Sequence, residues 1–368
     1  MRRASRKLLI ALVLFCVIGY LIYRFIHQAN FSWARIMGSV REANPYLLLL
    51  SILTIYVCYA VRALRWKVFQ QNLGPSRFST IYGVTLAGFS AVHLMGRLGE
   101  PVRPLLMARK EKLPVADMFG IYALERLFDF ASMAVIAAAG LFLFEPPADS
   151  GDKSRTVVAA ARIGGVILFV IVAAAIGALG YLRFHGSARL EQRLRGWLAG
   201  HGWKRRIAGI ILGFVRGVQA IRTWGQLALA SFYSAVHWFL VLVIYLWVSE
   251  SFGGKLGAIN LSGAMLLLAV TLAGSAVQLP AVGGGSQAAS MIAYTAIFGV
   301  ESEAAFVAAI VLWLVTFAAC SLAGVPLLIH EGLSLGELRR IAAHQKEIVS
   351  GEVAGDAGTA PGRGDATE

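Results

Sequence analysis

The chain has 368 residues, of which 58% are hydrophobic and only 15% charged, and its formal net charge is +14 at pH 7. A typical soluble domain carries about 25% charged residues, so this composition argues against a soluble domain and indicates a polytopic membrane protein. The basic residues fall mainly in gaps between apolar runs, which is a pattern of membrane topology rather than of a nucleic-acid-binding surface. The cysteines, Cys16, Cys58 and Cys320, lie within apolar runs, and their spacing predicts neither a disulfide framework nor a zinc site.

The first predicted segment comprises residues 1–44. Basic residues precede an apolar run at 8–26, which we expect to be a retained transmembrane helix because no small-residue cleavage site of a signal peptide follows it. The basic residues place the N-terminus in the cytoplasm. Residues 27–44 are then predicted to form an outside loop with a short interfacial helix around Trp33.

A second span is predicted at residues 45–61, and Pro45 suits the first turn of its helix. Basic residues concentrate on the cytoplasmic side of membrane proteins, so the next three are interpreted as markers of the cytoplasmic end of this span. They are Arg62, Arg65 and Lys67.

The next apolar run, at 81–95, has about 15 residues, whereas a full crossing needs about 20. Glycines and prolines follow at 96–104, and a second short arm ends in basic residues at 109–112. Because basic residues flank both ends, the pattern predicts a re-entrant hairpin that enters and leaves on the cytoplasmic side. Residues 115–144 are expected to cross outward and to complete a first repeat over residues 45–144.

A connecting region is predicted at residues 145–226, with a span at 157–182 and a basic stretch at 183–223. The basic stretch contains nine basic residues and the single acid Glu191, and its apolar residues recur at helical spacing. We expect amphipathic helices that lie on the anionic inner leaflet. The same spacing argues against nucleic acid as a partner.

A second repeat is predicted at residues 227–330. It contains a span at 227–248, a hairpin whose first arm is 261–279, and a return span at 304–329. The order of span, hairpin and span begins outside in the first repeat and inside in the second, which predicts an inverted repeat. The expected fold is therefore all-α, with about six transmembrane helices and two re-entrant helical hairpins, followed by a largely disordered cytoplasmic tail at 331–368.

The first hairpin and the span after it place charged residues within apolar sequence: Arg97, Glu100, Arg103, Glu125, Arg126 and Asp129. A charge in hydrocarbon costs several kcal/mol, so such residues are by default a functional-site hypothesis. A guanidinium matches phosphate oxygens, and a helix that begins at Pro101 would add N–H donors, so Arg97 and Arg103 are predicted to hold an anionic headgroup. The alternative is an ion-pair network that only holds the hairpin closed.

Glu125 and Asp129 lie four residues apart and therefore on one helix face, with Arg126 in reach of Asp129. One base against two acids leaves a carboxylate without a local partner. We expect Arg97 or Arg103 to complete a polar pocket there. The alternative is that these residues lie near the cytoplasmic surface and are solvated.

In the second hairpin the predicted substrate-binding residues are Gly283, Gly284, Gly285 and Ser286. Ser286 could cap a helix whose N–H groups meet an anion, whereas the alternative is the backbone geometry of a tight turn. No lysine follows as in a nucleotide-binding loop. His237 is predicted to be a satisfied interior histidine rather than a proton relay. No catalytic constellation or metal-ligand spacing is visible, so we expect no catalytic residue, metal or cofactor.

The stretches GRLGEPVRPLLMARKEKLP and ALERLFDF resemble paired motifs of the flippase-like integral membrane family, which is related to the transmembrane region of lysylphosphatidylglycerol synthases. The proline and glycine turn at 279–285 resembles its second motif, although Gln287 stands where the family often has glutamate. The resemblance covers about residues 45–329 and implies movement of a lipid headgroup between leaflets. The soluble aminoacyl-transfer domain of the synthases is expected to be absent, so lipid aminoacylation is not expected.

The resulting hypothesis is a flippase or scramblase-like transporter of the inner cell membrane, with both termini cytoplasmic. It would move an anionic phospholipid or a polyprenyl-linked lipid headgroup. An alternative is a membrane-embedded glycosyltransferase that acts on lipid-linked sugars. A third reading is a scaffold that recruits a soluble partner through residues 183–223.

Overall fold

The computed structural model describes residues 32–144, 221–275, 278–279 and 283–331, with isolated positions between 163 and 174. This part of the chain is almost entirely helical and contains five helices that are long and apolar enough to cross a membrane. They are Pro45–Gln70, Phe78–Gly99, Asp117–Leu143, Trp224–Ser251 and Ser302–His330. The prediction of an all-α polytopic membrane protein is therefore confirmed.

Two described stretches supply the elements. Before residue 145 they are α2 (Trp33–Glu42), α3 (Pro45–Gln70), α4 (Phe78–Met95), the short helix η1 (Gly96–Gly99), α5 (Val102–Glu111) and α6 (Val115–Leu143). After residue 220 they are α10 (Trp224–Ser251), α11 (Gly254–Gly257), α12 (Leu261–Gly274), β1 (Gln278–Leu279), β2 (Gly283–Gly284), α13 (Gly285–Ile292), the π-helical turn η2 (Ala293–Ile297), α14 (Ser302–Trp313), the π-helical turn η3 (Leu314–Ala318) and α15 (Cys320–His330).

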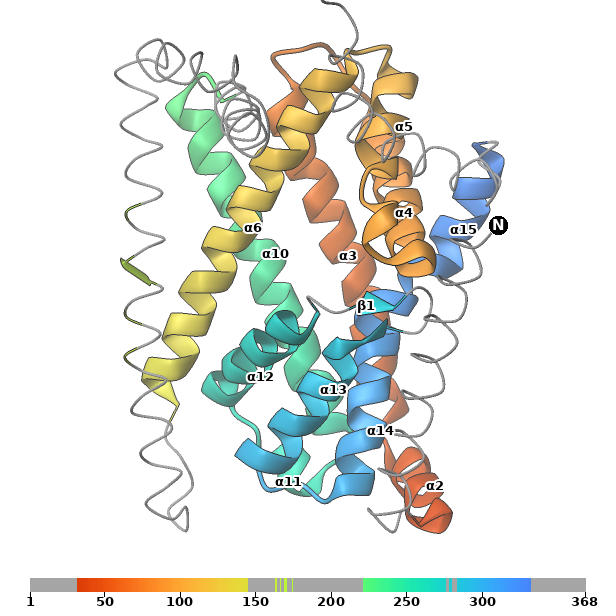
Figure 1. Ribbon diagram of the computed structural model, residues 1–368, viewed down its shortest axis with the longest axis vertical. Coiled ribbons are helices and arrows are strands. Elements are labelled where there is room, and N and C mark those ends of the chain that lie inside the picture. The colour runs from red at the N-terminus through yellow and green to blue at the C-terminus, as the bar shows by residue number, and fades with distance from the viewer. Residues whose placement is uncertain are drawn as a thin grey trace, which may run out of the picture.

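The first hairpin, α4–η1–α5, occupies the upper half of the bundle in Figure 1 and begins at the end where α3 stops. Its first arm ends at Gly96, whose φ of 64° lies in the left-handed region that favours glycine. Gly99 lies directly against the backbone of Ala91, where a Cβ would have no room. Pro101, which has no N–H to satisfy, then caps α5. These residues let the chain reverse direction within the bundle.

The first arm of this hairpin is longer than the predicted run at 81–95. Together with η1 it extends over 22 residues, Phe78–Gly99, which is enough by length alone to cross a membrane. The prediction that this arm is too short was therefore wrong. The chain forms a hairpin because of the reversal at Gly96, and not because the apolar run ends early.

The second hairpin, α12–β1–β2–α13, occupies the lower half of the bundle in Figure 1. At its tip β1 and β2 pair antiparallel, with Gln278 opposite Gly284. The φ angles of 82° at Gly283 and 105° at Gly284 explain why glycine is needed at this turn. The two hairpins come from opposite ends, and their tips meet near mid-height, where β1 contacts η1 (Figure 1).

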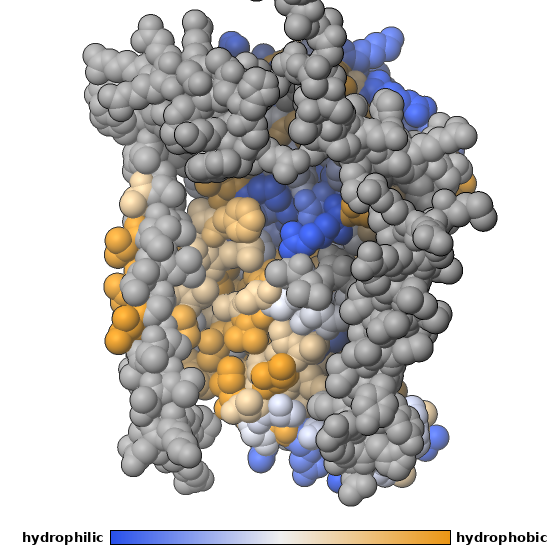
Figure 2. Space-filling model, viewed as in Figure 1, coloured by the Kyte–Doolittle hydropathy of each residue, from blue (hydrophilic) through white to orange (hydrophobic). Residues whose placement is uncertain are grey.

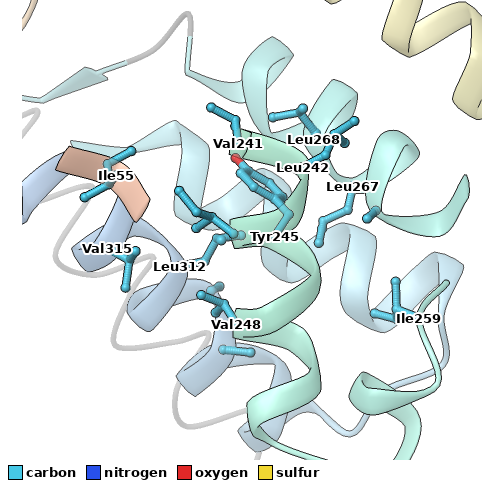
Figure 3. Close-up of a cluster of buried hydrophobic side chains, with 14 of the residues drawn as sticks. Ile55, Val241, Leu242, Tyr245, Val248, Ile259, Leu267, Leu268, Leu312 and Val315 are labelled. Carbon is cyan, nitrogen blue, oxygen red and sulfur yellow. The ribbon is translucent and has the colours of Figure 1, made fainter. Parts of the chain in front are cut away.

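Tight packing of apolar side chains joins the long helices. Figure 3 shows one buried cluster in which Ile55 of α3, Tyr245 of α10, Leu267 of α12 and Leu312 of α14 lie together. Lipid is as apolar as these side chains, so close van der Waals packing rather than removal from water holds such helices together.

The first hairpin also packs closely against α15. Gly324 lies against the backbone of Leu86 and the hydroxyl of Ser90, so a Cβ at this position would overlap both. Ser90 Oγ donates a hydrogen bond to the carbonyl oxygen of Cys320 over 3.2 Å. Small residues of this kind let two helix backbones approach each other in a membrane.

The described helices can be compared with the predicted spans. The crossings predicted at 115–144, 227–248 and 304–329 correspond to α6, to α10 and to the continuous helix α14–η3–α15. The short helix predicted around Trp33 is α2. The second span was predicted to end at residue 61, but α3 continues to Gln70, so Arg62 and Arg65 lie inside the bundle and not at its surface.

Other predicted segments lie wholly or mostly outside the described residues. They are the spans at 8–26 and 157–182, the basic stretch at 183–223 and the tail at 331–368. The division into two inverted repeats stays a prediction.

Candidate functional site

A set of charged residues, buried except for the partly exposed Arg126, lies between the first hairpin and the long helices, and we call it the charged cluster. It consists of Arg62 and Arg65 from α3, Arg103 from α5, and Glu125, Arg126 and Asp129 from α6. α10 adds His237 and Ser234 at its edge. Side chains of α3, α5, α6 and α10 therefore converge on one polar site.

Helical spacing explains why these side chains meet. Arg62 and Arg65 lie three residues apart on one face of α3, and Glu125 and Asp129 lie four apart on one face of α6. The two faces point toward each other, because both arginines pair with both carboxylates. Arg103 reaches the same place from the second arm of the hairpin.

Glu125 is the centre of the charged cluster and has no exposed surface. Its Oε2 accepts a hydrogen bond from Arg103 Nη1 over 2.6 Å. Its Oε1 accepts from Arg62 Nε and from Arg65 Nη2, each over 3.1 Å. Hydrogen bonds from a charged donor to a charged acceptor are about twice as strong as neutral ones, so this carboxylate ties α3 and α5 to α6.

Asp129 uses both of its oxygens in the same way. Its Oδ1 accepts from Arg65 Nη2 over 2.7 Å, and its Oδ2 accepts from Arg62 Nη2 over 2.5 Å. Arg126 Nη2 lies 3.0 Å from Oδ2 as well. All four carboxylate oxygens of the charged cluster thus have arginine partners.

The charged cluster holds more positive than negative charge. Four guanidinium groups face two carboxylates, so two positive charges remain uncompensated among these residues. Arg62 Nη1 lies 3.1 Å from His237 Nε2, and because arginine only donates, this ring nitrogen must accept and the histidine is neutral. Buried charge without a partner is costly, so the excess favours an anion at this site.

Aromatic rings surround two of the arginines. The guanidinium carbon of Arg103 lies 4.4 Å from the centre of the Trp66 ring, and that of Arg62 lies 4.8 Å from the centre of the Phe89 ring. Gly88 leaves room for this arrangement, because a Cβ there would meet the side chain and backbone of Arg103. Rings stabilise a cation through their negative faces, and they fix the direction in which each guanidinium points.

One edge of the charged cluster reaches the surface. The side chain of Arg126 is 31% exposed and stacks over Tyr122, whose hydroxyl donates to Glu100 over 2.9 Å. Glu100 pairs in turn with Arg97, the side chain of which is 59% exposed. Figure 2 shows hydrophilic surface at this height, between α6 and the first hairpin and beside apolar surface. A chain of polar contacts therefore links the exposed side chain of Arg97 to Arg126 and the charged cluster.

The structure separates the predicted residues of the first hairpin into two groups. Arg103 joins Glu125 as expected, whereas Arg97 pairs with Glu100 over 3.9 Å at the surface and not with Glu125 or Asp129. The alternative of a solvated pair at 125 and 129 was wrong, because both carboxylates are buried. The structure therefore brings together Arg103, Glu125, Arg126 and Asp129 of the six predicted residues, and their role in binding a substrate stays a prediction.

The predicted residues of the second hairpin lie outside the charged cluster. The N-terminal cap of α13 is Gly284, whose N–H donates to the side chain of Gln287, so the expectation that Ser286 caps this helix was wrong. A Cβ on Gly283 would overlap Trp313 Nε1 and the Gln287 side chain, so this glycine is required by packing. Within the described residues, no hydrogen bond or ion pair joins Gly283, Gly284, Gly285 or Ser286 to the charged cluster.

Sequence reasoning missed Arg62 and Arg65. Basic residues after an apolar run usually mark the end of a span, but here large apolar residues continue beyond them to Phe69. The spacing was the available signal, because Arg62 and Arg65 share one helix face with buried neighbours whereas Lys67 is exposed. His237, predicted to be an interior histidine, is buried and borders the charged cluster.

A metal site was not expected from the sequence. Within residues 32–144, 221–275 and 283–331, no group of histidine, cysteine and acidic side chains could hold a metal ion. The guanidinium groups of the charged cluster suit the binding of an anion.

Comparisons with known proteins agree with this architecture. Residues 8–324 match the family described as the lysylphosphatidylglycerol synthase TM region. A UPF0104 membrane protein of Methanothermobacter thermautotrophicus is 22% identical over 325 residues, which cover 82% of this chain and 90% of that protein. The glycosyltransferase AglD of Haloferax volcanii is 24% identical over 274 residues, which cover 68% of this chain and 43% of that protein. The chain belongs to the family of the lysylphosphatidylglycerol synthase transmembrane region.

Proposed function

We propose that this protein is a flippase or scramblase-like transporter that moves an anionic lipid headgroup between the leaflets of the inner cell membrane. The observation that carries the proposal is the charged cluster, in which four arginines face two carboxylates inside a membrane-spanning bundle. A purely structural ion-pair network would be balanced in charge, since an uncompensated buried charge destabilises the fold. An anionic headgroup would supply the missing negative charge.

The surface edge of the charged cluster supports lateral access for a lipid. Arg97 and Arg126 are partly exposed between α6 and the first hairpin, and Arg103 lies further inside. We propose that Arg97 and Arg126 receive the headgroup, that Arg103 binds it next, and that Glu125 and Asp129 hold the arginines in position. The acyl or polyprenyl chains would remain in the bilayer.

No nucleotide-binding motif accompanies this site in the sequence. The proposed transport would therefore follow a lipid or ion gradient, or the consumption of the lipid on the receiving side. Basic residues between the spans support a cytoplasmic location for both termini, and residues 183–223 would rest on the anionic inner leaflet.

Translocation in liposomes tests this proposal. Purified protein would be reconstituted with fluorescent anionic and polyprenyl-linked lipids, and a membrane-impermeant quencher would report the fraction of lipid in the outer leaflet. We expect faster translocation than in empty vesicles. Arg126→Gln should slow it at least tenfold without unfolding the protein, because Asp129 keeps Arg62 and Arg65 as partners.

The matched control is Arg41→Gln, which removes one positive charge from an exposed position on α2. Its rate should equal that of the unchanged protein. Equal rates for vesicles with and without protein, or for Arg126→Gln and Arg41→Gln, would contradict the proposed transport.

A second candidate function is a membrane-embedded glycosyltransferase that acts on lipid-linked sugars. The similarity to the glycosyltransferase AglD favours it, although the matched region covers only 43% of that protein. This candidate requires turnover of a sugar donor. Incubation with nucleotide sugars and polyprenyl-phosphate sugars, followed by mass spectrometry of the lipid products, separates it from transport.

A further inference from the structure

The charged cluster contains buried donors that have no acceptor. Five nitrogen atoms lack a hydrogen-bond partner within the described residues: Arg65 Nε, Arg103 Nε, Arg103 Nη2, Arg126 Nε and His237 Nδ1. They come from α3, α5, α6 and α10, the same four elements that meet at Glu125 and Asp129. Most buried polar groups in folded proteins are hydrogen-bonded, so a group of five unpaired donors at one place calls for an explanation.

The carboxylates of the charged cluster do not pair with these donors. Both oxygens of Glu125 and both oxygens of Asp129 already accept from arginines. An external ligand for the remaining donors must therefore be rich in acceptors. It must also offset the two uncompensated positive charges of the four arginines.

Phosphate groups differ in these two properties. A phosphodiester, as in phosphatidylglycerol, has two unesterified oxygens and one negative charge. A phosphate monoester has three such oxygens and a charge of about −1.5 to −2 at pH 7. The monoester matches both the number of donors and the excess charge better than the diester does.

We infer that the charged cluster recognises a lipid with a terminal, doubly charged phosphate, such as a polyprenyl monophosphate or a diacylglycerol monophosphate, in preference to a phosphodiester lipid. This inference rests on the proposed function, because it names the headgroup class of the transported lipid. The phosphate lies among the guanidinium groups of Arg65, Arg103 and Arg126, with His237 as a neutral donor beside them.

Competition binding tests the inference. Purified protein in detergent would bind a fluorescent polyprenyl monophosphate, and farnesyl phosphate, dioctanoyl phosphatidic acid, dioctanoyl phosphatidylglycerol and inorganic phosphate would compete. We expect the two monoester lipids to compete at concentrations at least tenfold below phosphatidylglycerol and inorganic phosphate. Equal competition by phosphatidylglycerol would overturn the preference for a monoester, and equal competition by inorganic phosphate would overturn recognition of a lipid.

Charge variants check that the preference comes from the charged cluster. Arg126→Gln lowers the excess from two positive charges to one, so the preference for monoester over diester should fall to less than threefold. Arg41→Gln should leave the preference unchanged. An unchanged preference in Arg126→Gln would contradict the inference.

The outcomes for transport and for recognition can be told apart. Translocation of lipids in liposomes without a monoester preference would refute the inference and leave the proposed transport standing. A monoester preference in binding without translocation would refute the transport and leave the inference standing.

Discussion

The two hairpins of this protein reach its centre from opposite ends, but different forces hold them in place. The first hairpin is tied to the long helices by the ion pair between Arg103 and Glu125 and by the rings around Arg103. The second hairpin has no charged residue between Leu261 and Ile292. Close packing holds it, for example the packing of Gly283 against Trp313. Charge fixes one hairpin and steric fit fixes the other.

This difference separates two tasks. Charged groups can exchange one partner for another, so the first hairpin is suited to bind and release an anion. A glycine turn with no space for a methyl group cannot adapt in this way, but it presents backbone without side-chain charge. Under the proposed function, the first hairpin recognises the headgroup and the second forms the surface past which it moves.

The largest expected effect is on the first hairpin, with Glu125→Gln. The change removes a buried carboxylate and leaves Arg62, Arg65 and Arg103 without one of their partners. Breaking a buried ion pair from one side typically costs about 3–5 kcal/mol. Thermal unfolding in detergent, followed by tryptophan fluorescence, should show a large fall in the midpoint.

The control for this change is Asp117→Asn, which removes a carboxylate from an exposed position in the first turn of α6. Its midpoint should stay close to that of the unchanged protein. Similar midpoints for Glu125→Gln and Asp117→Asn would show that charge does not hold the first hairpin.

A smaller effect is expected on the second hairpin, with Gly283→Val. The φ of 82° disfavours valine, and its side chain would overlap Trp313 and Gln287, so we expect destabilisation by about 1–3 kcal/mol. The matched control is Gly253→Val, because Gly253 also has a positive φ, of 63°, but no atom lies within 4 Å of a Cβ built there. The difference between the two unfolding midpoints measures the packing contribution.

The affinity for an anionic lipid headgroup should distinguish Gly283→Val from substitutions in the charged cluster. The folded fraction of Gly283→Val should bind an anionic lipid with unchanged affinity while translocating it more slowly. A loss of binding as large as that in Arg126→Gln would mean that the second hairpin also recognises the headgroup.

The smallest effect is expected for Arg97→Gln at the surface edge of the first hairpin. The pair with Glu100 is long, at 3.9 Å, and the arginine side chain is mostly exposed, so the stability change should stay below about 1 kcal/mol. Translocation should slow by a few fold, because the first contact with the headgroup weakens. A stability loss similar to that of Glu125→Gln would place Arg97 in the buried network.

Several parts of this structure follow from the sequence. The glycines and prolines at 96–104 and at 280–285 predict both reversals, since few other residues allow them. The spacing of Glu125 and Asp129 predicts one polar helix face. That helix has too few basic residues near the two carboxylates, which predicts an arginine partner from another element. In the structure this partner is Arg103.

Other parts depend on tertiary contacts that local patterns do not encode. Arg62 and Arg65 read as markers of a span end, but the cluster stabilises them within a helix that continues to Gln70. The local sequence does not distinguish Arg97 from Arg103. In the structure Arg97 lies on η1 and faces outward, whereas Arg103 lies on α5 and faces α6. The sequence suggests Ser286 as the N-terminal cap of α13, but the cap lies two residues earlier, at Gly284.

Under the proposed function, the meeting of the two hairpin tips lies in the path of a polar group that crosses the membrane. A bilayer presents about 30 Å of hydrocarbon to a charged headgroup. In this bundle η1 contacts β1, the centre of the Trp313 ring lies 5.3 Å from that of the His93 ring, and Trp313 Nε1 lies against Gly283. Under the proposed function, a headgroup that leaves Arg103 for the other leaflet would have to pass this contact, where the bulky Trp313 side chain lies.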